Sequence, residues 1–351
     1  NAFTGSIPSL DSLTQLQQLI LYSNALTGSI PSLDKLIQLQ VLALDINALT
    51  GSIPSLDNLT QLQYLWVHNN SLEDSVPPSV ASLRSLVSMQ LQHNRLTGTL
   101  NADVFNNLTQ LQALYLYNNA LSGELPTSIA TLANLVNVFD PTVQLTLAIV
   151  QLSSNQLQGT ISSDIFALPS LSTFALASNC MQGPLPTSIC ESSSLQKLLL
   201  DGLHTASSCQ QPVLGGLIPG VYSLGRSAAG LADQLHECFF SMPQLNVLHL
   251  SGNGLTGSLP STANSNFTDL VLSHNSIRGL IPRSLQQQQV WSTLDLSYNR
   301  FTGELSSSFT SSFEDIPAAS LKLSINRLSG EIPQSLQHAT KLTILDGNLF
   351  S

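Results

Sequence analysis

Apolar and polar residues alternate in short stretches along this chain, and the same alternation returns every 22 to 27 residues except at two interruptions. In one such stretch Leu19 and Leu21 alternate with Ile20 and Tyr22. A two-residue period is typical of a strand with one buried face. Each copy of the pattern therefore predicts a short strand whose leucines face inward and whose intervening residues face outward.

Every copy ends on an asparagine, which we call the ladder asparagine. Its amide can satisfy turn backbone groups that would otherwise be buried without a partner. A period of this length is typical of a solenoid, in which each strand pairs in parallel with the equivalent strand of the next copy. The ladder asparagines are Asn1, Asn24, Asn47, Asn70, Asn94, Asn119, Asn155, Asn179, Asn253, Asn275, Asn299, Asn326 and Asn348.

The repeat resembles the plant-type leucine-rich repeat family, whose consensus is L-x-x-L-x-L-x-x-N-x-L-x-G-x-I-P. The resemblance implies an α/β-type repeat solenoid, with a parallel sheet on the concave face and short 3-10 or irregular turns on the convex face. Parallel crossovers make it right-handed. One complete copy is Leu16, Leu19, Leu21, Asn24, Leu26, Gly28, Ile30 and Pro31, and another is Leu111, Leu114, Leu116, Asn119, Leu121, Gly123, Leu125 and Pro126.

A solenoid adds repeats to one continuous core, so residues 1–351 are expected to form a single domain of about 13 to 14 repeats. The chain starts and stops inside a repeat, and we expect it to be part of a longer protein. An irregular island at about 201–241 and a small insertion at about 139–146 interrupt the pattern. Two interpretations of these segments stay open: they are recognition elements, or they are tolerated surface loops.

Composition and motifs narrow the class of function. Only 9% of residues are charged, and the net charge of -10 provides no basic stripe for nucleic acid. No apolar run reaches the roughly 20 residues that span a bilayer. His236-Glu237-Cys238 lacks the spacing of a zinc protease, and nucleophile-elbow, P-loop and dinucleotide motifs are absent. We expect no enzyme, no cofactor and no bound metal.

Potential glycosylation sites and clustered cysteines predict an extracellular or cell-surface location. Four sequons begin at Asn58, Asn69, Asn107 and Asn266. Glycans are expected at some of Asn58, Asn107 and Asn266, and less readily at Asn69, where a glycan would crowd the concave face.

All four cysteines lie around the island, which suggests disulfides in an oxidising compartment, although four buried thiols would also fit. Stacking of neighbouring repeats favours two of the possible pairings. These are Cys180 with Cys209 and Cys190 with Cys238.

The outward strand positions of the first five repeats hold most of the tyrosines and one of the two tryptophans. Exposed Tyr and Trp favour a binding surface for a protein or carbohydrate, or for a second copy of the chain, but they can also stack as an intramolecular ladder. The predicted partner-binding residues are Tyr22, Tyr64, Trp66, His68, Tyr115 and Tyr117.

The resulting prediction is a non-catalytic recognition or adhesion module that binds through its concave face. Two alternatives stay open. A structural building block of an extracellular matrix, cell wall or filament fits the low charge and the open strand edges. A secreted inhibitor of a wall-degrading enzyme is implied by the family resemblance alone.

Overall fold

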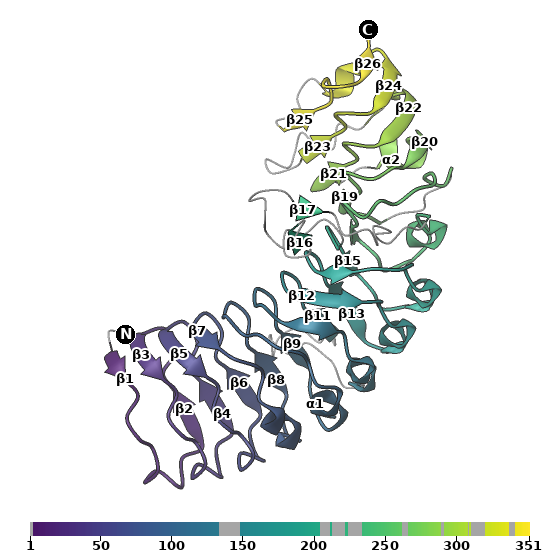
Figure 1. The fold of residues 1–351 in the computed structure, drawn as a ribbon. Coiled ribbons are helices and arrows are strands. Elements are labelled where there is room, and N and C mark those ends of the chain that lie inside the picture. The colour runs from purple at the N-terminus through teal and green to yellow at the C-terminus, as the bar shows by residue number, and fades with distance from the viewer. Residues whose placement is uncertain are drawn as a thin grey trace. The chain divides into compact units, whose positions relative to one another are not determined.

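The computed structural model describes residues 3–132, 148–203, 211–212, 222–223, 234–261, 266–288, 291–307, 309, 320–336 and 341–351. The chain divides into two compact units, Asn1–Asn179 (unit 1) and Cys180–Ser351 (unit 2). Both contain stacked parallel rungs, which confirms the predicted leucine-rich repeat solenoid (Figure 1). That the whole chain forms one continuous domain stays a prediction. The small insertion and most of the island lie outside the described residues.

The main sheet of unit 1 is parallel and receives one strand from each repeat. Its inward row is apolar, with Leu42, Leu65, Met89 and Leu114 in register on successive strands and almost fully buried. The strands are β2 (Gln18–Ile20), β4 (Val41–Ala43), β6 (Tyr64–Trp66), β8 (Ser88–Gln90), β9 (Ala113–Tyr115), β11 (Ala148–Gln151) and β13 (Leu171–Ala175).

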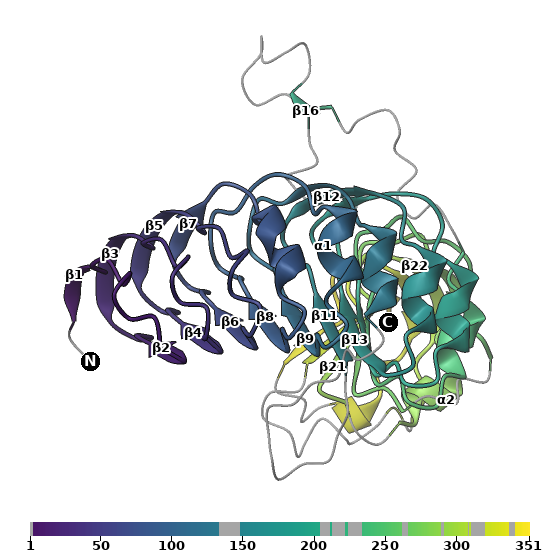
Figure 2. The same ribbon diagram turned by 90° about the horizontal axis from the view of Figure 1, so that it is seen from below.

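A second row of parallel strands follows the ladder asparagines of unit 1, as Figure 2 shows for β1, β3, β5 and β7. Glycine is required in this row at Gly28, where φ is +75° and an added Cβ would lie 3.3 Å from the Cβ of Ser6. The strands are β1 (Thr4–Ser6), β3 (Ala25–Ser29), β5 (Ala48–Ser52), β7 (Ser71–Glu73), β10 (Ser122–Glu124) and β12 (Gln156–Gly159).

Short helical turns return the chain toward the next strand, in agreement with the predicted convex side. Asn101 begins the one α-helix described in unit 1, because its Oδ1 accepts the N–H of Asp103 at 2.9 Å. The helices of unit 1 are η1 (Pro78–Ser82), α1 (Ala102–Asn106), η2 (Thr127–Thr131) and η3 (Ser163–Ala167).

The ladder asparagines hold each turn to the repeat before it. The Nδ2 of Asn47 donates to the carbonyls of Leu21, Leu44 and Asp45 at 3.0, 3.1 and 3.2 Å, and its Oδ1 accepts the N–H of Leu26 at 3.0 Å. One side chain thus satisfies four backbone groups in two repeats. This confirms the structural role predicted for the ladder.

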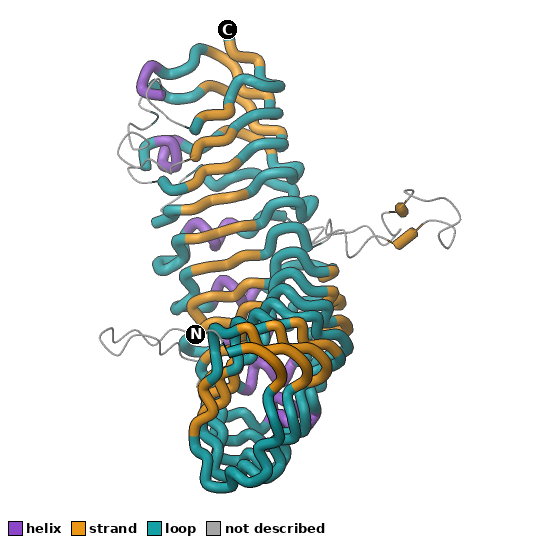
Figure 3. Tube along the Cα trace, turned by 90° about the vertical axis from the view of Figure 1, so that its left-hand side faces the viewer, coloured by secondary structure: helices purple, strands orange, loops and turns teal. Residues whose placement is uncertain are grey.

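Unit 2 repeats the same construction, and Figure 3 shows its strands as successive rungs joined by loops. Its main-sheet strands are β15 (Lys197–Leu199), β18 (Val247–His249), β19 (Asp269–Val271), β21 (Thr293–Asp295), β23 (Ser320–Lys322) and β25 (Leu342–Thr343). The second row is β14 (Cys180–Met181), β20 (Arg278–Leu280), β22 (Arg300–Glu304), β24 (Arg327–Gly330) and β26 (Leu349–Phe350).

Within the island, β16 (Gln211–Pro212) and β17 (Tyr222–Ser223) form a small antiparallel pair. The helices of unit 2 are η4 (Thr187–Glu191), η7 (Glu237–Phe240), α2 (Arg283–Gln286) and η9 (Gln334–Leu336). Among the described residues of the chain, no helix has the length and apolar character needed to cross a membrane.

A disulfide joins two helices of unit 2. Cys190 in η4 and Cys238 in η7 are bonded, with 5.7 Å between their Cα atoms. This is one of the two pairings predicted, and it connects the rungs on either side of the island. The other predicted pairing involves Cys209, which lies outside the described residues.

Candidate functional site

Two aromatic clusters lie on the outward side of the unit 1 sheet. In the first, the rings of Tyr64 and Trp66 on β6 meet edge to face, with centroids 5.3 Å apart. The indole Nε1 of Trp66 also donates to the hydroxyl of Ser88 on the neighbouring strand at 3.1 Å. The indole is therefore held in place before any ligand arrives.

The second cluster is built around Tyr117. Its ring meets those of Tyr115 and His93 edge to face, with centroids 6.5 and 5.1 Å apart. Burial raises the pKa of the Tyr115 phenol, and Tyr117 adds to this rise. We call Tyr64, Trp66, His93, Tyr115 and Tyr117 together the aromatic surface.

The aromatic surface is less open than the alternating pattern predicted. Ala43, Ser88 and Ala113 occupy outward positions, yet they are only 1%, 4% and 3% exposed. Strands in a sheet lie about 4.8 Å apart, so a large side chain covers a small one on the next strand. The expectation that every intervening residue faces solvent was wrong at these three positions.

In the repeats of β2, β4, β6, β8 and β9, the residue two before the ladder asparagine lies just past the end of the strand, and we call these five residues the central row. Backbone hydrogen bonds place its members side by side, since Ser23 donates to Asp45, Ile46 to His68, Asn69 to Gln92 and His93 to Tyr117. The first member, Tyr22, is 53% exposed. The central row is Tyr22, Asp45, His68, Gln92 and Tyr117.

The middle of the central row is polar and buried. The Nε2 of His68 lies 3.7 Å from Oδ2 of Asp45, which is longer than a hydrogen bond. Burial raises the pKa of Asp45 above 3.8, opposed by the nearby imidazole. Burial likewise lowers the pKa of His68 below 6.5, opposed by Asp45 and assisted by His93. Both groups are thus pushed toward their neutral forms.

The structure places five of the six predicted partner-binding residues in the repeats of β6 and β9, which have β8 between them. Tyr22, 53% exposed, lies outside both ring clusters. The structure also adds Asp45, Gln92 and His93, which the sequence analysis did not assign to the site. For Asp45 and Gln92 the available signal was their shared position, two residues before a ladder asparagine. Their burial and partners depend on side chains from other repeats.

The four potential glycosylation sites are all exposed. Asn58 and Asn266 donate through Nδ2 to carbonyls of the preceding repeat, at 3.3 and 3.1 Å, and Asn107 ends helix α1. Asn69, at φ +52°, directly follows His68 of the central row. The expected order of occupancy, with Asn69 last, stays a prediction.

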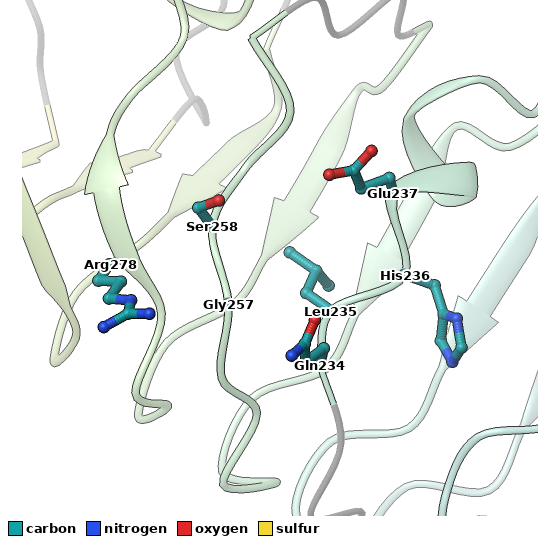
Figure 4. Close-up of a pocket in the computed structure, with 7 residues that line it drawn as sticks. All are labelled: Gln234, Leu235, His236, Glu237, Gly257, Ser258 and Arg278. Carbon is teal, nitrogen blue, oxygen red and sulfur yellow. The ribbon is translucent and has the colours of Figure 1, made fainter.

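Unit 2 contains a second candidate, a cavity of about 600 Å³ beside its flank strands. In Figure 4, Arg278 lies at one side of this cavity and Glu237 at another, while His236 points away from Arg278. The polar side chains of Gln234, Glu237, Ser258 and Arg278 are exposed and are already solvated. The aromatic surface, with large rings and buried polar groups together, is the stronger candidate.

Comparison with known proteins agrees with this fold. The family model named Leucine Rich Repeat matches residues 61–83, 110–132, 244–265, 266–288 and 291–312. Receptor-like protein 41 of Arabidopsis thaliana is 35% identical over 100 residues, which are 27% of this chain and 11% of that protein. Receptor-like protein EIX2 of Solanum lycopersicum is 28% identical over 123 residues, or 34% of this chain and 12% of that protein.

Solved structures match almost the entire chain. The plant peptide hormone receptor RGFR1 in complex with RGF2 has a TM-score of 0.75 at 28% identity, covering 99% of this chain and 50% of that one. The PEPR1–AtPEP1 structure has a TM-score of 0.75 at 25% identity, covering 99% and 48%. This chain therefore spans about half the length of these solved relatives.

The stacked parallel rungs and the continuous asparagine ladders within each unit define a leucine-rich repeat protein. The family model matches five repeats, and the receptor-like relatives and solved plant receptor structures agree, so the chain is similar to plant-type, extracellular leucine-rich repeat proteins.

Proposed function

We propose that this chain is a non-catalytic recognition module, outside the cell or at its surface, whose aromatic surface in unit 1 binds an extended peptide segment of a protein partner. The observation that carries the proposal is the pair of ring clusters on the outward side of a rigid sheet. Tyr and Trp provide large contact areas at low entropic cost and are enriched at binding hot spots. Trp66 is also preorganised by its hydrogen bond to Ser88.

The solved relatives support a peptide as the partner. The structures of RGFR1 with RGF2 and of PEPR1 with AtPEP1 are complexes, and the first is described as a peptide hormone receptor. A peptide lying across successive rungs would meet both ring clusters, because Trp66 and Tyr115 are in register with Gln90 on the strand between them. The parallel sheet thus supplies a repeating set of contacts along an extended chain.

A display selection tests this proposal. Random 12-residue peptides are selected on the immobilised chain, and the enriched sequences are measured by calorimetry against wild type and a Trp66→Ala/Tyr117→Ala variant. Each lost anchor should weaken binding about 30-fold, which corresponds to about 2 kcal/mol. The melting temperature should change little, because both side chains lie on the outward side of the sheet.

Tyr298→Ala is the matched control. Tyr298 is a 46% exposed tyrosine of unit 2 that stacks on His274, so its loss removes a comparable ring without touching the aromatic surface. Peptide affinity should be unchanged in this variant. A selection that enriches no peptide, or a double variant that melts earlier and still binds, contradicts the proposal.

A further inference from the structure

Two aspartates on the outward sides of the two sheets have the same side-chain exposure, 10%. In unit 2, Asp295 on β21 faces a lysine on the next strand, with the Nζ of Lys322 3.3 Å from its Oδ2. Its other oxygen, Oδ1, accepts the hydroxyl and the N–H of Ser297 at 2.6 and 3.1 Å. Both oxygens of this buried carboxylate therefore have partners, and its charge is compensated.

Asp45 in unit 1 has weaker compensation. A hydrogen bond with its own backbone and the imidazole of His68 in the next repeat both lower its pKa, but burial outweighs them, and the Nε2 of His68 is 3.7 Å from Oδ2, beyond hydrogen-bond distance. Oδ1 is buried, and the described part of the chain offers it no hydrogen-bond partner. Burial lowers the pKa of His68, which disfavours a positive charge on this imidazole. A carboxylate without a counter-charge is costly at this depth.

Two other polar atoms of the central row are in the same situation as Oδ1 of Asp45. The Nδ1 of His68 and the Oε1 of Gln92 are also buried, with no partner among the described residues. No lysine or arginine occurs in the central row. Tyr22, which is 53% exposed, occupies the position equivalent to Asp45 in the preceding repeat, and Trp66 lies two residues before His68. Aromatic faces attract cations, and the oxygens of Asp45 and Gln92 that lack partners accept hydrogen bonds.

We infer that Asp45 anchors a cationic side chain, a lysine or arginine of the bound peptide, which takes in unit 1 the place that Lys322 takes in unit 2. The inference rests on the proposed function, and it names the chemistry that the aromatic surface selects. The ammonium or guanidinium donates to the Asp45 carboxylate while its aliphatic stem packs against the neighbouring rings.

A metal ion fits these residues less well. Protein metal sites use three or more ligands, and the described residues contain no group of three His, Cys, Asp or Glu side chains placed to share one ion. A cationic side chain needs only one carboxylate and an aromatic face. The protein's net charge of -10 also favours the approach of a basic peptide.

The first test uses the peptides selected on the immobilised chain. They should be enriched in lysine or arginine, and replacing that basic residue by norleucine should weaken binding to wild type at least about tenfold. Against Asp45→Asn, the basic peptide and its norleucine analogue should bind equally. Asp295→Asn is the control, and it should retain the full difference between the two peptides.

The second test needs no ligand. Asp45→Asn removes an uncompensated buried charge, so the melting temperature should stay the same or rise. Asp295→Asn removes a compensated charge and should lower it by about 3 °C or more. Equal losses in both variants would show that Asp45 is a structural partner and would overturn the inference.

The outcomes separate the two proposals. If binding of the selected peptides depends on Trp66 and Tyr117 but the peptides contain no basic residue, the cation inference is wrong and peptide recognition is still supported. A selection that enriches nothing would remove both. Peptides whose basic residue is needed equally by wild type and Asp45→Asn would place the cation elsewhere on the surface and also overturn the inference.

Discussion

The outward sides of the two sheets differ although their scaffolds are alike. Unit 1 presents the aromatic surface and a buried aspartate that has no cationic neighbour. Unit 2 presents small polar groups that satisfy one another, such as the hydroxyls of Ser251 and Ser273, 2.9 Å apart, and the Asp295–Lys322 pair. Beneath both, ladder asparagines make the same hydrogen bonds. The same scaffold thus carries different outward side chains. Unit 1 has the two ring clusters and Asp45, whereas unit 2 has the stacked pair His274–Tyr298 and the His249–Asp201 pair.

The strongest test of this comparison concerns the scaffold that the two units share. Asn155 in unit 1 and Asn253 in unit 2 are 2% and 0% exposed, and each bridges backbone groups of two repeats. Replacing either by alanine leaves several buried carbonyls and one N–H without partners. Each change should lower the free energy of unfolding by about 5 kcal/mol. Chemical denaturation of both variants checks this, and unequal losses would show that the ladders are not equivalent.

The second largest effect should come from opening the disulfide, which should destabilise unit 2 and leave unit 1 unchanged. Opening the Cys190–Cys238 bridge, which closes a sequence separation of 48 residues, should destabilise unit 2 by about 4 kcal/mol through the entropy of the unfolded chain. A Cys190→Ser/Cys238→Ser variant, followed by hydrogen exchange, should lose protection in β15 and β18 and keep it in β4 and β6. Equal loss of protection in both sets of strands would contradict the assignment of this effect to unit 2.

Introducing a lysine beside Asp45 tests whether a missing counter-charge is what distinguishes unit 1 from unit 2. His68→Lys places an ammonium beside Asp45, as Lys322 stands beside Asp295. The variant should gain about 1 kcal/mol in stability, because the buried carboxylate acquires a counter-charge. It should also lose its preference for basic peptides. Thermal unfolding and calorimetry measure the two effects, and His68→Gln controls for loss of the imidazole alone.

The smallest expected effect is a pH dependence confined to unit 1. The pKa of His68 is lowered below 6.5, so its contribution to stability is present above pH 6.5 and is lost as the pH falls through the folded-state value. The pKa of Asp45 is raised above 3.8, so its contribution is lost as the pH rises through the folded-state value and returns in acid.

Wild type should therefore lose stability relative to His68→Gln as the pH falls below 6.5. Asp45, His68 and His93 are the titrating groups that act on one another there. Melting temperatures of the two proteins across this interval provide the measurement. Parallel curves for the two proteins would contradict the direction assigned to His68.

The sequence predicted the scaffold well because each repeat has the same leucine spacing and the same turn asparagine. Leucine spacing predicted the inward row, and the bonds of Asn47 are those that a turn amide should make. The outward positions were harder. The burial of Ala43 and Ser88 depends on side chains of other repeats, and so does the uncompensated state of Asp45. Such neighbours lie about one repeat away in the chain, and a local pattern contains no information about them.

The asparagine ladder also bears on how this protein ages. Asn253 precedes Gly254, an arrangement in which the backbone nitrogen readily attacks the side-chain amide of an unfolded chain and converts asparagine to aspartate. In the folded protein the Nδ2 of Asn253 is held by the carbonyls of Leu200 and Leu250, at 2.7 and 3.1 Å, and the residue is fully buried. An aspartate there would direct a carboxylate at those carbonyl oxygens. Each long excursion into the unfolded state thus risks a chemical change that prevents refolding, so the shelf life of the protein is governed by how rarely it unfolds.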